Sequence, residues 1–169
     1  GPSTLRMVIE KSRNLMTVRI AQDLGIKKIT NFSKKLNIYD NPDELMSISL
    51  GSAETTLLKL TSAYCSFING GKLVSPIFVD RIQDSTGSTI FNSEKRNCPK
   101  CNEVSFLGNE FPKIKDNFPQ IFSPETAYQI TSMLEGVVKR GTGKKLRDLN
   151  LDLAGKTGTT NKNTDAWFI

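Results

Sequence analysis

The segment Gly155-Lys156-Thr157-Gly158-Thr159-Thr160 is the stretch from which the fold of this chain is best deduced. Its Gly-Lys-Thr triplet suggests a phosphate-binding loop. That motif requires a glycine five residues before its second glycine, and Asn150 stands there instead. The similar run Gly141-Thr142-Gly143-Lys144 fails in the same way, because Val138 and Lys145 occupy the required positions. The sequence therefore argues against nucleotide binding.

The alternative interpretation of this segment is a strand that forms one wall of a catalytic cleft. Lys156 would place a cation in the cleft, and Gly158, which has no side chain, would let a peptide-like substrate lie against the backbone. The hydroxyl groups of Thr157 and Thr159 would hold a carboxylate, and the N–H group of Thr159 would stabilise a developing oxyanion. A three-residue Lys-Thr-Gly motif is weak evidence by itself, so the rest of the chain must support it.

The composition restricts the chemistry. The 169 residues include no histidine, which excludes Ser-His-Asp and Cys-His catalysis and histidine metal sites. A catalytic base must then come from Lys, Asp, Glu or Tyr. The hydrophobic fraction of 37% and the charged fraction of 24% are typical of one soluble globular domain. No apolar run reaches the roughly 18 residues that span a bilayer, so export and anchoring signals are expected outside this chain.

The net charge of +6 does not indicate a nucleic-acid partner, because the basic residues are scattered and no nucleic-acid motif accompanies them. Attraction to anionic lipid or anionic cell-wall polymer remains open. Cys65 lies in an apolar helical stretch and is predicted to be a buried small hydrophobic residue. Cys98 and Cys101 leave three interpretations open: a local disulfide, half of a zinc site, or two free thiols. Too few ligands accompany them for zinc, and no metal or cofactor is predicted.

Periodicity and capping residues predict the elements. Ser123-Pro124-Glu125 is typical of a helix start, with Ser as N-cap and Pro at the first helical position. The predicted helices are residues 4–10, 15–24, 29–36, 54–69 and 123–139, with one further turn at 144–148. The predicted strands are residues 77–83 and 88–91, which form a hairpin, and residues 151–159 and 165–169. Residues 92–120 are predicted to be an irregular insertion within a single domain.

A second motif, Ser12-x-Asn14, lies between the first two predicted helices. On its own it indicates helix capping. Paired with Lys-Thr-Gly downstream, it matches two parts of the set Ser-x-x-Lys, Ser-x-Asn and Lys-Thr-Gly that marks serine β-lactamases and penicillin-binding proteins.

The resemblance becomes specific over longer stretches. The run from Ser12 to Arg19, SRNLMTVR, resembles the S-x-N region of class A, bifunctional penicillin-binding proteins, as does GPSTLR just before it. The stretch from Glu54 to Gly71 resembles a helix and turn of that family. RGTG at 140–143, AGKTGTTN at 154–161 and DAWF at 165–168 resemble its final block. The resemblance implies an α/β transpeptidase fold, with a mainly antiparallel sheet flanked by helices, incomplete in this chain.

The resemblance also implies a function. Members of this family acylate a serine with the D-Ala-D-Ala end of a peptidoglycan stem peptide, pass the acyl group to a neighbouring amine, and are targets of β-lactams. By position, Ser12 would relay a proton, Asn14 would hold the substrate amide, and Lys156 would set the field around Ser12. Thr157, Gly158 and Thr159 would bind the stem peptide or β-lactam, and the Thr159 N–H would supply half of the oxyanion hole.

The nucleophile motif is missing, because no serine of this chain has a lysine three residues later. Residues 1–169 are therefore expected to be a partial transpeptidase domain, inactive alone, that lacks the nucleophile segment and the C-terminal strands. The full-length protein is expected to be anchored in the inner membrane, with this domain on the periplasmic face. A glycosyltransferase domain, a role in cell shape and contacts with other cell-wall synthesis proteins are also expected. The alternatives are a D,D-carboxypeptidase, a serine β-lactamase, or a non-catalytic cell-wall binding module.

Overall fold

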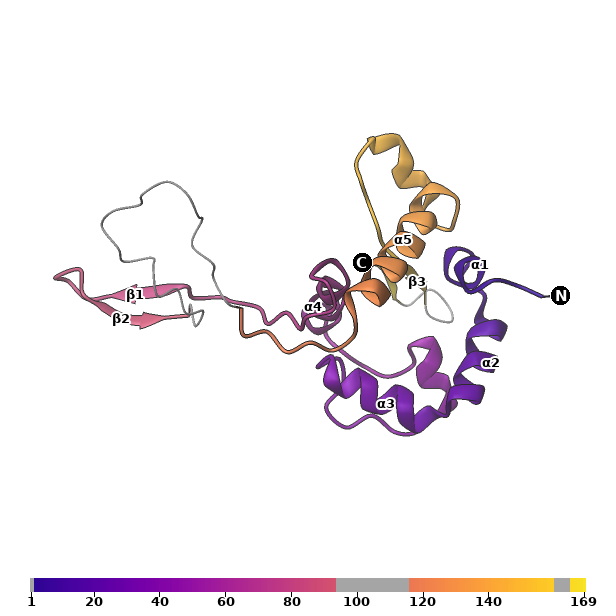
Figure 1. Cartoon of the computed structure of the whole chain (residues 1–169), viewed down its shortest axis with the longest axis horizontal. Helices are drawn as coiled ribbons and strands as arrows, with labels where there is room; N and C mark the ends of the chain where they lie inside the picture. The colour runs from indigo at the N-terminus through magenta and orange to yellow at the C-terminus, as the bar shows by residue number, and fades with distance from the viewer. Residues whose placement is uncertain (1, 94–115, 160–164) are drawn as a thin grey trace. The chain divides into compact units, whose positions relative to one another are not determined.

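The computed structural model describes residues 2–93, 116–159 and 165–169 (Figure 1). The chain divides into two compact units. The larger contains residues 1–74 and 120–169, and the smaller contains residues 75–119. The larger unit holds the motifs Ser12-x-Asn14 and Lys156-Thr157-Gly158, so it carries the candidate site.

Helices make up most of the larger unit. They are α1 (Leu5–Glu10), α2 (Asn14–Leu24), α3 (Ile26–Lys35), α4 (Leu57–Ile68) and α5 (Pro124–Lys139), together with the 3₁₀ helices η1 (Met46–Leu50) and η2 (Lys144–Leu149). All five predicted helices and the turn at 144–148 are confirmed, and η1 was not predicted. The third helix begins three residues earlier than predicted, because Gly25, with φ +84°, is the only residue between the end of α2 and the start of α3.

Side-chain caps fix where three of the helices begin. The hydroxyl groups of Thr4, Thr56 and Ser123 each accept a hydrogen bond from the backbone N–H three residues later. The cap on Thr56 explains why α4 begins at Leu57 and not at residue 54 as predicted. The predicted Ser-Pro-Glu start of α5 is confirmed.

The core forms around α5, which packs against α1 and α4 (Figure 1). Val137 of α5 is fully buried, and Val8 of α1 and Ala63 of α4 are nearly so. The N-terminal helix and the helix that precedes the Lys-Thr-Gly segment are therefore held together by apolar burial.

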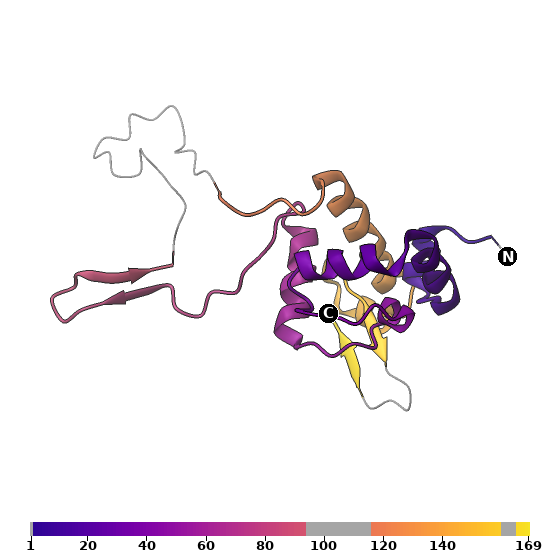
Figure 2. The ribbon, with the colours of Figure 1, turned by 90° about the horizontal axis from the view of Figure 1, so that it is seen from below.

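The strands at the C-terminal end are short. β3 (Thr157–Thr159) pairs antiparallel with β4 (Ala166–Phe168), as the hairpin in Figure 2 shows. The prediction of a strand over 151–159 is wrong for residues 151–156. The backbone N–H of Gly155 donates to the carbonyl oxygen of Leu134 in α5 rather than to another strand. Gly155 also packs against Phe168 and the Ile169 carbonyl oxygen so closely that a Cβ would overlap them.

The smaller unit contains a second antiparallel hairpin, β1 (Arg81–Gln83) and β2 (Thr89–Asn92), with an irregularity in register after Ile82. Its turn depends on Asp84, whose carboxylate accepts hydrogen bonds from the Thr86 hydroxyl and from the backbone N–H groups of Thr86 and Ser88. These bonds, the Thr86 hydroxyl bond first among them, lower the pKa of Asp84. The predicted hairpin and turn are confirmed, but the first strand begins at Arg81, so the prediction of a strand over 77–83 is wrong for residues 77–80.

Some predictions fall outside the described residues. Most of the predicted insertion at 92–120 lies there, as do Cys98 and Cys101. The prediction that Cys65 is buried is wrong: it is half-buried, because it lines an open apolar pocket of about 140 Å³ with residues of α4 and α5. Within the described ranges, no helix is long and apolar enough to cross a membrane. Nor does any cluster of three acidic or cysteine side chains there suit a metal ion.

Candidate active site

The candidate site begins at the turn between α1 and α2, where Ser12 lies. The N–H of Ser12 donates to the Ile9 carbonyl at 3.2 Å, and the N–H of Arg13 donates to the Val8 carbonyl at 3.0 Å. This pair of bonds defines a Schellman motif, whose left-handed position is normally glycine. Ser12 occupies that position with φ +50°. Non-glycine residues are uncommon in that region and often mark functional positions.

The turn presents Ser12 to the Lys-Thr-Gly segment. The Lys156 Nζ donates to the Ser12 Oγ at 2.8 Å, across 144 residues of sequence, and to the Thr157 carbonyl oxygen at 2.8 Å. Lys156 is half-buried, and this desolvation lowers its pKa. Because the ammonium donates to the serine oxygen, the Ser12 proton is directed away from Lys156 and is available to another acceptor.

The geometry of β3 leaves one of its backbone edges unpaired with β4. Lys156 and Ile169 exchange both N–H···O bonds, at 2.7 and 3.2 Å. Hydrogen-bonded and non-hydrogen-bonded pairs alternate along an antiparallel ladder. The next pair, Thr157 with Phe168, is therefore non-hydrogen-bonded, and so is the pair of Thr159 with Ala166. The N–H and C=O groups of Thr157 and Thr159 thus point away from β4, where an extended peptide can pair with them.

A second contact joins this strand to the loop after α5. The hydroxyl groups of Thr142 and Thr157 lie 2.6 Å apart in a hydrogen bond. The backbone N–H of Thr142 in turn donates to the carbonyl oxygen of Glu10 at 3.1 Å. Thr142 therefore links the end of α1 to the Lys-Thr-Gly strand.

The structure brings Ser12, Lys156 and Thr157 together. Gly158 and Thr159 follow on the exposed part of β3, where a Cβ on Gly158 would meet nothing within 4 Å. Asn14 is exposed at the first residue of α2, two residues after Ser12. Sequence reasoning gave no role to Glu10, Arg140 or Thr142. The run RGTG at 140–143 was noticed only as part of a resemblance.

These residues offer acyl-transfer chemistry without a metal. A serine hydroxyl hydrogen-bonded to a lysine can pass a proton, and the unpaired N–H groups of β3 can hold a carbonyl or oxyanion. The apolar pocket lined by Cys65 is a separate feature that includes none of these residues.

Comparison with known proteins identifies the class. The family described as "Penicillin binding protein transpeptidase domain" matches residues 1–169. The chain therefore belongs to the penicillin-binding protein transpeptidase family, and the family resemblance deduced from the sequence is confirmed.

The chain is similar to proteins named Penicillin-binding protein 1A. It is 44% identical to that of Rickettsia bellii over all of its length and 22% of the relative's. It is 34% identical to that of Pseudomonas aeruginosa over 99% of its length and 24% of the relative's. The chain thus spans about a fifth to a quarter of the length of these relatives.

Solved structures support the same fold. The crystal structure of Penicillin-Binding Protein 1A from Haemophilus influenzae matches 99% of this chain and 28% of its own, with 30% identity and a TM-score of 0.81. A D,D-transpeptidase domain from Eggerthella lenta, at 20% identity and a TM-score of 0.69, shares the fold over 99% of this chain and 45% of its own. The predicted α/β transpeptidase fold is confirmed, here with small antiparallel sheets.

Proposed function

We propose that this chain forms one wall of the D,D-transpeptidase cleft of a longer polypeptide that cross-links peptidoglycan. Three facts support this: the family match over residues 1–169, the relatives' greater length, and the absence of any Ser-x-x-Lys among the 169 residues. The acylated serine would then come from another part of the polypeptide. The chain alone would lack activity.

The proposed reaction has two steps. The nucleophilic serine attacks the carbonyl carbon between the two D-alanines of a stem peptide, and the C–N bond breaks. The serine loses its hydroxyl proton, the leaving amine nitrogen takes up a proton, and an acyl-enzyme forms. The amine of a neighbouring stem peptide then attacks the ester, loses a proton and forms the cross-link, while the released serine oxygen takes a proton back. A β-lactam would enter by the first step, because its ring amide takes the place of the D-Ala–D-Ala bond.

Ser12 would pass the proton to the leaving nitrogen. The observation that supports this role most strongly is the 2.8 Å contact between Lys156 Nζ and Ser12 Oγ, because it directs the Ser12 proton away from the lysine. Lys156 would keep a positive field over the cleft and replace the proton that Ser12 gives up. Asn14 would hold the substrate amide from the start of α2.

The strand β3 would bind the substrate. Its N–H and C=O groups at Thr157 and Thr159, which do not pair with β4, suit a peptide that adds alongside as a further strand. The Thr157 carbonyl oxygen already accepts from Lys156 Nζ and would accept the peptide N–H as a second donor. Gly158 leaves room for the backbone of that peptide. The N–H of Thr159 would stabilise the oxyanion, and the threonine hydroxyls would hold the terminal carboxylate. We also infer that the longer polypeptide is anchored in the inner membrane with this domain on its periplasmic side, where peptidoglycan is cross-linked.

The test is acylation of the longer polypeptide by a fluorescent penicillin, followed by a transfer assay with a stem pentapeptide and an amine acceptor. Lys156→Met should reduce the acylation rate by about a hundredfold or more, because it removes the charge beside the developing transition state. Lys59→Met is the matched control, since the Lys59 side chain lies in a different part of the unit and forms an ion pair with the exposed Asp40. Equal acylation rates for the Lys156 variant and the wild type would refute the proposal. Transfer to water but never to the amine would favour a carboxypeptidase or a β-lactamase instead.

A further inference from the structure

Glu10 carries a buried carboxylate that the proposed reaction does not use. It is the last residue of α1 and only 6% exposed. A negative charge is unfavourable at the C-terminal end of a helix, and burial adds a desolvation penalty. A carboxylate retained in such a place needs strong compensation, so its partners show what it holds together.

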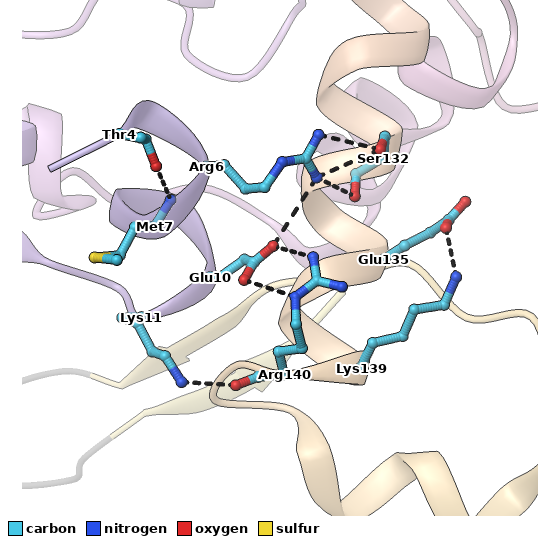
Figure 3. Close-up of polar contacts among 9 residues, drawn as sticks. All are labelled: Thr4, Arg6, Met7, Glu10, Lys11, Ser132, Glu135, Lys139 and Arg140. Atoms are coloured by element: carbon cyan, nitrogen blue, oxygen red, sulfur yellow. Dashed lines mark hydrogen bonds and ion pairs between the residues drawn. The ribbon is translucent and has the colours of Figure 1, made fainter.

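The main partner of Glu10 is Arg140, which follows the last residue of α5 (Figure 3). Arg140 Nη2 lies 2.5 Å from one carboxylate oxygen of Glu10, and Arg140 Nε lies 3.3 Å from the other. Arg6, one helical turn earlier on α1, approaches at 3.9 Å and also donates to the Ser132 carbonyl of α5. The two-pronged contact fixes the angle between the helices as well as their distance.

Glycines provide the space for this pair. A Cβ at Gly136 would overlap the Glu10 Oε1, and a Cβ at Gly141 would overlap the Glu10 carbonyl oxygen. The carboxylate thus lies directly against the backbone of α5. A larger residue at Gly141 would meet backbone atoms of both helices and push α1 away from α5, whereas one at Gly136 would displace the side chains of Glu10 and Arg140.

Backbone hydrogen bonds next to Glu10 and Arg140 link this pair to the candidate site. Lys11 Nζ donates to the Arg140 carbonyl at 2.7 Å, and the Thr142 N–H donates to the Glu10 carbonyl at 3.1 Å. The Thr142 hydroxyl then bonds the Thr157 hydroxyl on β3. In the other direction, Glu10 lies two residues before Ser12. The pair formed by the buried Glu10 and the largely exposed Arg140 therefore adjoins both chain segments that meet at the Lys156–Ser12 bond.

We infer that Glu10 and Arg140 are positioning residues, which set the Ser12 turn and the Lys-Thr-Gly strand at hydrogen-bonding distance. This inference rests on the proposed transpeptidase function. Neither residue contacts the substrate in this account. They act through Ser12 and through Thr142.

The pair on the same helix that serves as a control is Glu135 with Lys139. The Lys139 Nζ lies 2.8 Å from the Glu135 Oε2, the two residues are one helical turn apart on α5, and both side chains are substantially exposed (Figure 3). It touches neither α1 nor the loop at 140–142 in the described contacts. Glu135→Gln removes the same charge as Glu10→Gln without disturbing the link to the site.

The experiment uses the longer polypeptide and two readouts. The first is the acylation rate constant with a fluorescent penicillin, resolved into binding and chemical steps. Glu10→Gln should lower the chemical step about ten- to a hundredfold with little change in binding, since a small misplacement of a reacting group has effects of that size. Thr142→Val, which keeps the charges of Glu10 and Arg140 and removes only the hydroxyl link, should act in the same direction. Glu135→Gln should match the wild type.

The second readout needs no activity. Competitive acylation of amines across a pH series, with peptide mass spectrometry, gives the pKa of Lys156. Burial lowers this pKa in the intact site. If the strand and the turn separate, water enters and the pKa rises toward the ordinary value of about 10.4. We expect this rise in Glu10→Gln and Thr142→Val and no change in Glu135→Gln.

The two readouts separate the two claims. If the wild type is not acylated, the proposed function fails, while the labelling still decides the positioning role. If folded Glu10→Gln and Thr142→Val both keep the wild-type chemical step and the wild-type pKa of Lys156, the inference is overturned. Should Glu10→Gln fail to fold, Thr142→Val gives the decision, because its side chain is exposed and close in volume to valine.

Discussion

The left-handed backbone of Ser12, the serine of the candidate site, leads to an unusual prediction: at this position glycine should give a more stable fold than alanine. Ser12 has φ +50° at the glycine position of a Schellman motif. A non-glycine residue in this region costs about 1–2 kcal/mol. Glycine avoids that cost, although its freedom in the unfolded chain takes back about 0.4–1 kcal/mol. The net expectation is that glycine is more stable than alanine at this position by about 0.5–1 kcal/mol.

The comparison of Ser12→Gly with Ser12→Ala isolates this backbone effect. Both variants lose the exposed hydrogen bond that Lys156 donates to Ser12. The free energy lost with this bond therefore cancels when the two variants are compared. Ser62 provides the matched control, because it lies inside α4. At Ser62 the order should reverse, with glycine less stable than alanine by about 1 kcal/mol.

The assay is urea unfolding, monitored by circular dichroism, of the wild type and of the glycine and alanine variants at Ser12 and Ser62. With a typical m-value of about 1–3 kcal/mol/M in urea, a difference of 1 kcal/mol corresponds to a shift in urea midpoint of about 0.3–1 M. If Ser12→Gly is less stable than Ser12→Ala, the argument that Ser12 is held in a strained conformation is wrong. In the longer polypeptide, both Ser12 variants should be acylated slowly by penicillin, so glycine should separate stability from activity.

Three further predictions follow from the same contacts. The 169-residue chain alone should gain no mass on incubation with a penicillin, because it has no Ser-x-x-Lys; a stoichiometric adduct that hydroxylamine removes would contradict this. Burial lowers the pKa of Lys156 in the folded chain. Between this lowered pKa and the ordinary value of about 10.4, the unfolded chain binds more protons than the folded one, so the free energy of unfolding should rise with pH in that range. Lys156→Met should lack this increment in a pH series of urea titrations, and an identical pH slope would refute it. Gly136→Ala should destabilise the chain by about 2–4 kcal/mol, because its Cβ would displace the buried carboxylate of Glu10; a wild-type midpoint in urea would show that the pair can move without loss.

The sequence predicted the helices well because their signals are local. Thr4, Thr56 and Ser123 cap α1, α4 and α5, and Gly70 and Gly141 follow the ends of α4 and α5, within a few residues of the expected bounds. The strand over 151–156 was wrongly predicted because the alternating apolar residues there do not pair with a neighbouring strand. Gly155 instead bonds to Leu134 of α5, a contact between residues far apart in sequence. η1 was missed because 3₁₀ helices have weak sequence signals.

The candidate site divides in the same way. Ser12, Lys156 and Thr157 carry motifs of short spacing, so they could be named from the sequence, and the structure brings them together. Glu10 belongs to none of the motifs quoted from the sequence, and Arg140 was noticed only as the first residue of RGTG. Their importance comes from the burial of Glu10 and from their contact across 130 residues, and neither property can be read from the sequence around them. A glutamate at a helix end beside two basic residues looks like an ordinary surface residue until its exposure is known.

The central claim is that residues 1–169 form one wall of a penicillin-reactive cleft whose nucleophile lies elsewhere in the polypeptide. The most direct test is to label the longer polypeptide with a fluorescent penicillin and to identify the modified residue by peptide mapping, in the wild type and in Lys156→Met. We expect one adduct, on a serine of a Ser-x-x-Lys motif outside residues 1–169. It should form about a hundredfold more slowly in Lys156→Met than in the wild type. An adduct on any serine within residues 1–169, or labelling that does not depend on Lys156, would contradict it.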